Sequence, residues 1–169
     1  MRSLITAAAI VCCGTQVAVA GEPVTPADSR PALLKALDGR WIMTGDVMGK
    51  PVTYTLEAGP TLQGAFTELH MTDVQDPPQY EARVYIGVAP DDGTVIAHWM
   101  DSFGAKFSVP HGTGAISGNT VRFTIAYADG PFRDTLTYDA DAGAWILEIE
   151  ASQPGGAWQH FARYDIRRN

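Results

Sequence analysis

The sequence contains only two cysteines, and their positions decide whether the mature protein keeps any thiol. Cys12 and Cys13 both lie inside an apolar run at residues 4–19, which ends at Ala20 in a small-x-small pattern. This arrangement is typical of a secretory signal peptide. We therefore predict a signal peptide over residues 1–20, cleaved near Ala20, and a periplasmic or secreted location. A lipoprotein signal is the alternative, but both cysteines stand in mid-run without the residues that should precede an acylated cysteine.

Cleavage would remove both cysteines, which excludes disulfides and thiolate metal sites from the mature protein. It would leave 149 of the 169 residues, enough for one domain with a substantial core. Loss of Arg2 leaves 11 Lys and Arg against 19 Asp and Glu, a net charge of −8. This acidic balance argues against nucleic acid and anionic membrane surfaces as partners. The apolar run is too short for an anchor, so we expect no integral membrane segment in the mature chain; the oligomeric state is not indicated.

Common catalytic and metal-binding patterns are also absent. His70, His98, His111 and His160 lie on separate segments, with no His-x-His or His-Glu-x-x-His spacing. There is no Gly-x-Ser-x-Gly nucleophile motif and no glycine-rich phosphate loop opening a helix. We therefore assign no catalytic residue, no metal ligand and no cofactor.

Residues 21–38 are predicted to form an exposed arm followed by a short helix. The arm is rich in proline and small residues, and Asp28 or Ser29 can cap a helix that has Pro31 in its first turn. Such a helix has about two turns, so it should be stable only when packed against something larger.

From residue 39 onward, apolar and polar residues alternate with a period of two, which is typical of β-strands. We predict about ten strands, in the segments 41–47, 52–56, 62–71, 80–88, 95–101, 106–109, 121–127, 132–138, 145–151 and 158–166. The connections are short and carry turn residues, which indicates antiparallel hairpins. Closing the meander would remove its exposed edges. We therefore predict an all-β fold, an antiparallel up-and-down barrel over residues 39–169 with a short N-terminal helix; a two-sheet sandwich is the alternative.

Several segments resemble known families. Gly39-Arg40-Trp41 resembles the calycin group, which includes the lipocalins, where a short helix leads into Gly-x-Trp on the first strand. A closer resemblance is to a lipocalin-like family of exported bacterial proteins without established function. It is carried by residues 98–104 (HWMDSFG), 112–118, 130–138 (GPFRDTLTY), Trp145 and 161–164. This resemblance implies a β-barrel, but it implies no activity and no catalytic set.

A weaker resemblance is to nitrobindin-type haem-binding barrels, which also have ten strands and open with Gly-x-Trp. In that family a histidine near the C-terminal end of the barrel binds the iron, and the resemblance gives this role to His160. The glycines and proline that should follow the tryptophan are matched only loosely, at residues 44–46 and 49–51.

An inward-facing set of aromatic residues predicts a ligand cavity. A barrel of about ten strands is too wide for side chains to fill completely, which leaves room for a small-molecule site. The candidate ligand-binding residues are Tyr54, Trp99, Asp101, Phe107, Phe123, Tyr127 and Phe132. The alternative is a collapsed barrel filled by the same aromatic residues. Trp41 should plug one end, with Arg163 or Arg167 of the last strand stacked on its face.

His98, Trp99 and Asp101 look like a catalytic cluster in the sequence, but strand geometry separates them. Trp99 and Asp101 share one face of their strand, and His98 lies on the other. Asp101 is then either a polar group at the cavity rim or an anchor for the backbone N–H groups of the following turn.

The preferred hypothesis is an exported barrel that binds a small apolar or amphipathic molecule without chemistry. One alternative is a barrel enzyme, an isomerase or hydrolase, that uses Asp101 with a tyrosine or histidine of the cavity. The others are a module that binds another envelope protein and a haem protein that uses His160.

Overall fold

The structure is a computed structural model that describes residues 28–169. The predicted signal peptide and residues 21–27 of the predicted arm lie outside the described residues. Across the described range, no helix has both the length and the apolar character needed to cross a membrane.

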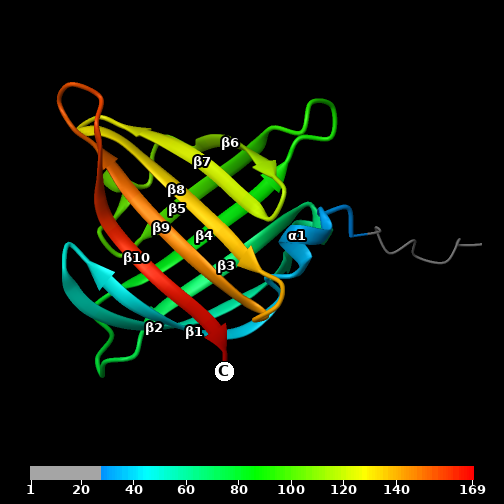
Figure 1. Cartoon of the computed structure of the whole chain (residues 1–169), viewed down its shortest axis with the longest axis horizontal. Helices are drawn as coiled ribbons and strands as arrows, with labels where there is room; N and C mark the ends of the chain where they lie inside the picture. Colours follow the sequence, from blue (N-terminus) through cyan, green and yellow to red (C-terminus); the bar gives the residue numbers. More distant parts are fainter. Residues whose placement is uncertain (1–27) are drawn as a thin grey trace, which may run out of the picture.

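Ten antiparallel strands close into a barrel (Figure 1). Each strand pairs with its neighbours in the sequence, and the last pairs with the first, so the sheet has no free edge. The predicted all-β, up-and-down barrel is confirmed, and the sandwich alternative is wrong. In chain order the strands are β1 (Gly39–Val47), β2 (Lys50–Thr61), β3 (Phe66–Asp73), β4 (Glu81–Val88), β5 (Val95–Asp101), β6 (Gly112–Ser117), β7 (Thr120–Tyr127), β8 (Gly130–Asp139), β9 (Ala144–Ser152) and β10 (Trp158–Arg168).

The pairing of β1 with β10 closes the barrel. Its register runs from Trp41 opposite Arg168 to Val47 opposite Ala162. Near the middle of this pairing, a Cβ added at Gly45 would overlap the backbone of Arg163, so the two strands meet at a distance that only glycine permits. Closure therefore depends on a residue without a side chain at this point.

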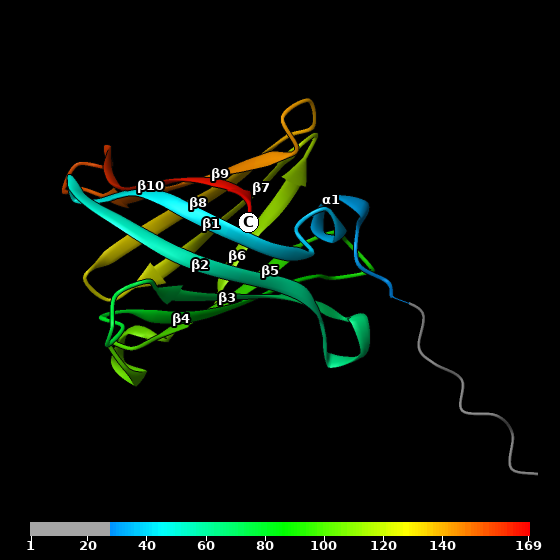
Figure 2. The same ribbon diagram turned by 90° about the horizontal axis from the view of Figure 1, so that it is seen from below.

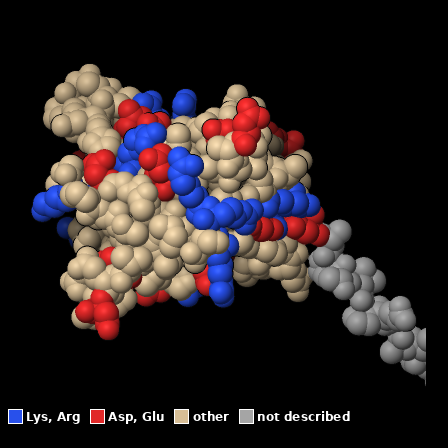
Figure 3. All heavy atoms as spheres, turned by 60° about the horizontal axis from the view of Figure 1, so that its bottom comes forward, with Lys and Arg blue, Asp and Glu red and all other residues tan. Residues whose placement is uncertain are grey.

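The two-residue alternation separates an apolar interior from a charged exterior. On β4, Ala82, Val84 and Ile86 are buried, while Glu81 and Arg83, which alternate with them, are exposed. The charges outside are mixed in sign: Figure 3 shows basic side chains next to acidic ones across one face, in keeping with ion pairs from several strands. Mixed surface charge of this kind solubilises the barrel more than it stabilises it.

One predicted strand, residues 106–109, is wrong. Residues Ala105–Phe107 form a short 3-10 helix, and the strand of this region is β6, which begins at Gly112. Two glycines conceal β6 in the sequence. A Cβ at Gly114 would overlap the carbonyl oxygen of Arg122, and one at Gly112 would press on Ile125, so the close approach of β6 to β7 requires both.

The strand predicted over residues 62–71 is β3, which is shorter than the prediction. It begins only at Phe66, because Leu62–Gly64 form a 3-10 turn in which Leu62 and Gln63 have positive φ.

The short helix α1 (Ala32–Lys35) covers one end of the barrel (Figures 1 and 2). Leu34 and Leu37, on and just after the helix, are completely buried. The predicted side-chain cap is wrong: Pro31 is the N-cap residue and makes no side-chain cap hydrogen bond. The carboxylate of Asp28 is occupied elsewhere, because it binds the buried guanidinium of Arg30.

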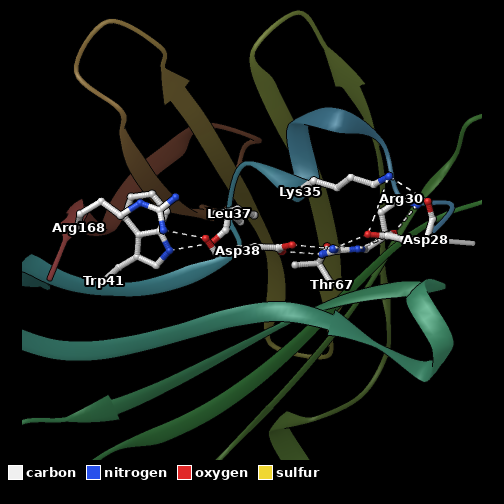
Figure 4. A network of polar contacts seen from close by, with 8 residues as sticks. All are labelled: Asp28, Arg30, Lys35, Leu37, Asp38, Trp41, Thr67 and Arg168. Atoms are coloured by element: carbon white, nitrogen blue, oxygen red, sulfur yellow. Dashed lines mark hydrogen bonds and ion pairs between the residues drawn. The ribbon is translucent and has the colours of Figure 1, made fainter.

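Arg30 fastens the N-terminal segment to the barrel (Figure 4). Its Nε and Nη2 donate to Asp28, its Nη1 and Nη2 donate to Asp38 at 2.8 Å each, and Nη1 also donates to the Thr67 hydroxyl at 3.0 Å. All five N–H groups of the guanidinium are therefore used. The hydrogen bond from Arg30 lowers the pKa of Asp28 to about 2, and the hydrogen bonds to Asp38 and Asp28 raise the pKa of Arg30.

Trp41 plugs the same end, as predicted. It is 1% exposed, and its indole Nε1 donates to the carbonyl oxygen of Leu37 at 2.7 Å. The residue stacked on its ring is Arg168, 3.8 Å from the ring centroid, and not Arg163 or Arg167. The reason is register, because Arg168 is the residue directly opposite Trp41. Arg168 also donates to the carbonyl oxygen of Asp38 (Figure 4).

We expect Trp41→Ala to lower the free energy of unfolding by about 3–5 kcal/mol, because it removes a large buried ring and leaves a cavity. Urea unfolding followed by circular dichroism measures this. Met48→Ala, at an exposed turn at the other end of the barrel, is the control and should change stability by less than about 0.5 kcal/mol. An unchanged urea midpoint for Trp41→Ala would contradict the role of Trp41 as a plug.

Candidate functional site

The end of the barrel opposite α1 holds a cavity of about 420 Å³. Figure 2 shows the β1–β2, β3–β4 and β9–β10 connections at this end, away from the helix. Residues on or beside the connections, such as Val47, Phe103 and Asp129, line the mouth, and residues deeper in the strands line the interior. Its volume lies within the range of small-molecule sites, about 300–1,000 Å³.

The cavity wall is mainly aromatic. Its lining consists of Tyr54, Tyr80, Trp99, Phe103, Phe107, Tyr127, Phe132, Phe161 and Tyr164, with Val47, Ile125, Ile149 and three acids, Asp101, Asp129 and Asp134. Many of these rings touch. Phe132 makes edge contacts with both Tyr127 and Phe161, at centroid distances of 5.6 and 4.9 Å. Among the described residues, no lysine, arginine or histidine lines this cavity.

Six of the seven predicted ligand-binding residues line the cavity: Tyr54, Trp99, Asp101, Phe107, Tyr127 and Phe132. Phe107 reaches it from the 3-10 helix after β5, not from a strand. Phe123 does not reach it. It is buried farther from the mouth, where β6 and β7 approach closely and its ring fills the core. That any of these residues contacts a ligand stays a prediction.

Asp101 combines the two roles that its sequence position suggested. Its Oδ1 accepts the backbone N–H of Phe103 at 3.0 Å, which anchors the turn. Its Oδ2 accepts the Tyr80 hydroxyl at 3.4 Å, and Tyr80 in turn accepts the Trp99 indole N–H at 3.2 Å. Burial raises the pKa of Asp101 and of Tyr80. The result is a short polar chain on one side of an otherwise apolar wall.

Asp134 is a site residue that sequence reasoning missed. It lies on β8 between Phe132 and Leu136, opposite Phe123 on β7 and Ile149 on β9. Its side chain lines the cavity, yet the residue is only 2% exposed, and no described side chain or backbone group donates a hydrogen bond to its carboxyl. Burial raises the pKa of Asp134 to about 8. The alternation of β8 does indicate this residue, because Asp134 shares the inward face of the strand with Phe132 and Leu136.

Other lining residues were also missed, for different reasons. Tyr80 and Tyr164 were in phase with buried residues of their strands, but alternation alone does not show how far the cavity extends. Phe161 was hidden by an irregularity: the register of β10 against β9 shifts between His160 and Ala162. The shift turns Phe161 into the cavity and leaves His160 outside.

All four histidines lie on the outer surface. The imidazole of His160 is half-exposed, with Nε2 2.8 Å from Oδ2 of Asp46. His70 contacts Glu81 on the outer face, and the rings of His98 and His111 lie with their centroids 5.5 Å apart, tilted by 39°. His160 therefore does not line the cavity, and the haem role that the resemblance gives it stays a prediction. Over residues 28–169, no group of three or more His, Cys, Asp or Glu is arranged to hold a metal ion.

The mouth is surrounded by exposed apolar side chains. Phe103, Phe107 and Val109 of the β5–β6 connection are 69%, 43% and 63% exposed, and Met48 and Val74 of two other connections at this end are also exposed. An apolar rim lets an apolar ligand leave water before it reaches the interior.

Comparisons with known proteins give similarity at the level of the fold. No family profile and no curated protein matches this chain. Among solved structures, the crystal structure of Rv2717c from M. tuberculosis is similar, with a TM-score of 0.52 and 14% sequence identity. The match covers 83% of this chain and 99% of that one. At this identity the likeness supports the barrel fold alone.

The unpartnered carboxyl of Asp134 should make stability depend on pH. The unfolded chain releases this proton near its ordinary pKa of 3.8, whereas the folded chain keeps it up to about pH 8. The folded state therefore binds more protons in this window, and its stability falls as pH rises from about 4 to 8. Each pKa unit corresponds to about 1.4 kcal/mol, so the full effect is on the order of 5 kcal/mol.

We expect Asp134→Asn to be more stable than wild type by at least about 2 kcal/mol at pH 8, and the difference to close toward pH 4. Urea unfolding at several pH values measures this. Asp141→Asn, in the exposed turn at the plugged end, removes the same charge and should follow the wild-type curve. A constant difference between Asp134→Asn and wild type at all pH values would contradict the raised pKa.

Proposed function

We propose that this protein is an exported, lipocalin-like barrel that binds a small apolar or amphipathic molecule without chemistry. The observation that carries the proposal is the cavity of about 420 Å³, lined by nine aromatic residues, at the open end of the barrel. A ligand there would lose most of its apolar surface to the wall and could still meet a few polar groups, which is the usual composition of a small-molecule site.

The closed sheet and the plugged end support a preformed site. The wall belongs to a sheet without edges, and the opposite end is fixed by Trp41 and the Arg30 network. Because the cavity exists before binding, no free energy is lost in ordering its side chains when a ligand binds. The collapsed alternative, in which the aromatic residues fill the barrel, does not describe this structure, since the space between them is open.

Filling the cavity should abolish binding. Ile149 lines the cavity from β9, and its neighbour Glu148 points outward. We expect Ile149→Trp to weaken binding of a hydrophobic fluorescent dye by at least about tenfold, or 1.4 kcal/mol, because the indole would occupy the space. Glu148→Trp adds the same ring to the outer face and should bind the dye like wild type. Fluorescence titration measures both affinities, and circular dichroism confirms that both variants fold.

Two results would contradict the proposal. One is the absence of saturable dye binding to the wild-type protein, together with native mass spectra that show only the bare chain. The other is equal binding by wild type and Ile149→Trp, because the dye would then occupy a site outside the barrel.

Export is tested separately. We expect the protein from a Gram-negative host to be recovered in the periplasmic fraction with Gly21 as its first residue, because cleavage follows Ala20. Intact mass and N-terminal sequencing measure this. Deletion of residues 2–20 is the matched control and should leave the protein in the cytoplasm. A full-length, uncleaved chain in the periplasmic extract would contradict the assigned cleavage site.

One observation favours an enzyme as a second candidate. Asp101 and Asp134 both have raised pKa values inside a cavity, and shifted carboxyl groups are common among catalytic acids and bases. A bound molecule recovered unchanged after incubation with wild-type protein supports binding alone. Conversion of that molecule by wild type, lost in Asp134→Asn, would support catalysis.

A further inference from the structure

We propose that the cavity selects organic cations: a small apolar, preferably aromatic, molecule that carries an amine, with the ammonium group placed at Asp134. The inference rests on the proposed function and deepens it by naming the chemical class of the ligand. Three independent features of the site carry it: an unpaired buried carboxyl, a lining without any positive charge, and aromatic rings beside the carboxyl.

The first feature is the position of the carboxyl. Asp134 lies two residues farther into the barrel than Phe132 on the same face of β8, with Ile149 beside it on β9. It is nine-tenths and more buried, it borders the open space, and none of the described residues donates a hydrogen bond to it. Buried polar groups in native proteins nearly always have a partner. Since none of residues 28–169 supplies a donor, we infer that the partner of Asp134 comes from the cavity that its side chain borders.

The second feature is the sign of the charge around the ligand. The ionisable groups that face the cavity are the carboxyl groups of Asp101 on β5, Asp129 in the β7–β8 turn and Asp134 on β8, and four tyrosines from β2, β7, β10 and the segment before β4. Nothing in the described lining is positively charged. An anionic ligand would be buried against carboxylates without a counter-ion, which is costly. A cationic ligand would meet acidic groups that can become its counter-ion.

The third feature is the aromatic surround. The ring of Phe132 meets those of Tyr127 and Phe161 within 5.6 Å, next to the inward position of Asp134 along β8. Ring faces attract cations, and the attraction is stronger for an ammonium group away from water than for one at an exposed site. A carboxylate combined with aromatic rings therefore recognises an ammonium group better than a hydroxyl of the same size.

Binding of an amine should release a proton from Asp134 to solvent. In the empty cavity at neutral pH, burial keeps Asp134 protonated, and an amine in solution is an ammonium ion. In the complex the ammonium keeps its proton and the Asp134 O–H gives its proton to solvent, so the carboxylate and the ammonium pair. Burial keeps the facing tyrosines protonated throughout, because it raises the pKa of each. Amine binding should therefore release about one proton per molecule at neutral pH.

The test uses three probes with one ring system: naphthylmethylamine, naphthylmethanol and naphthoate. Isothermal titration calorimetry at pH 7, in two buffers of different ionisation enthalpy, gives both the affinity and the number of protons released. For wild type we expect the amine to bind at least about tenfold tighter than the alcohol, and the carboxylate to bind weakest. Proton release should accompany the amine and not the alcohol.

Variants separate charge recognition from general binding. Asp134→Asn keeps the shape of the side chain, so we expect it to lower the affinity for the amine at least about tenfold and to leave that for the alcohol within about twofold. Proton release with the amine should disappear. Asp141→Asn, at the opposite end, should behave as wild type in every measurement.

The outcomes distinguish the two proposals. If the alcohol binds wild type as tightly as the amine, or if Asp134→Asn does not change amine binding, cation selection is wrong and the ligand-binding barrel stands. If Asp134→Asn loses both probes while its circular dichroism spectrum shows that it is folded, Asp134 supports the cavity in general, and cation selection is again wrong. If no probe binds but the hydrophobic dye does, cation selection also fails. If neither the probes nor the dye bind, the proposed function itself fails.

Discussion

The closure of the sheet between β1 and β10 is the constraint on which the rest of the structure depends. It joins the two ends of the barrel domain and sets Trp41 directly opposite Arg168. Closure at ten strands fixes a circumference too large for side chains to fill from end to end. The chain uses Trp41 and the segment before it to fill one end. The other end stays unfilled, so both the plug and the cavity follow from the closure of the sheet at ten strands.

Two buried ionisable groups show how differently the ends are built. At the plugged end Arg30 uses all five of its N–H groups on Asp28, Asp38 and Thr67, and such complete pairing is what makes a buried charge tolerable. At the open end Asp134 has no donor among the described residues, and burial alone shifts its pKa. The same fold therefore gives the guanidinium of Arg30 all its hydrogen-bond partners and gives the carboxyl of Asp134, at the other end of the barrel, none from residues 28–169. That contrast is the reason to read Asp134 as a binding group and not as a defect of packing.

Strand alternation predicted the fold, the plug and five residues of the cavity wall, because all of these follow from which face of a strand a residue occupies. The sixth, Phe107, lines the cavity from a 3-10 helix and not from the predicted strand. Alternation failed where the backbone leaves ideal geometry. The glycines of β6 concealed a strand, since their role is close backbone approach, and the shift at His160 reversed the inside and outside of β10. Asp134 was missed for another reason. Polar residues on strands usually face water, and the sequence does not show that this one is surrounded by Phe123 and Ile149.

The carboxyl groups of Asp101 and Asp134 are not equivalent, and their difference gives a ligand one orientation. Asp101 already accepts the backbone N–H of Phe103 and the hydroxyl of Tyr80, so its lone pairs are partly used and it holds the rim in place. Asp134 lies deeper, and no group of residues 28–169 donates a hydrogen bond to its carboxyl. A charged head group gains most where the free carboxyl and the low dielectric coincide, while the apolar rim around Phe103 suits the remainder of the molecule. The ligand would therefore enter head first, with its ammonium group inward and its apolar body toward the mouth.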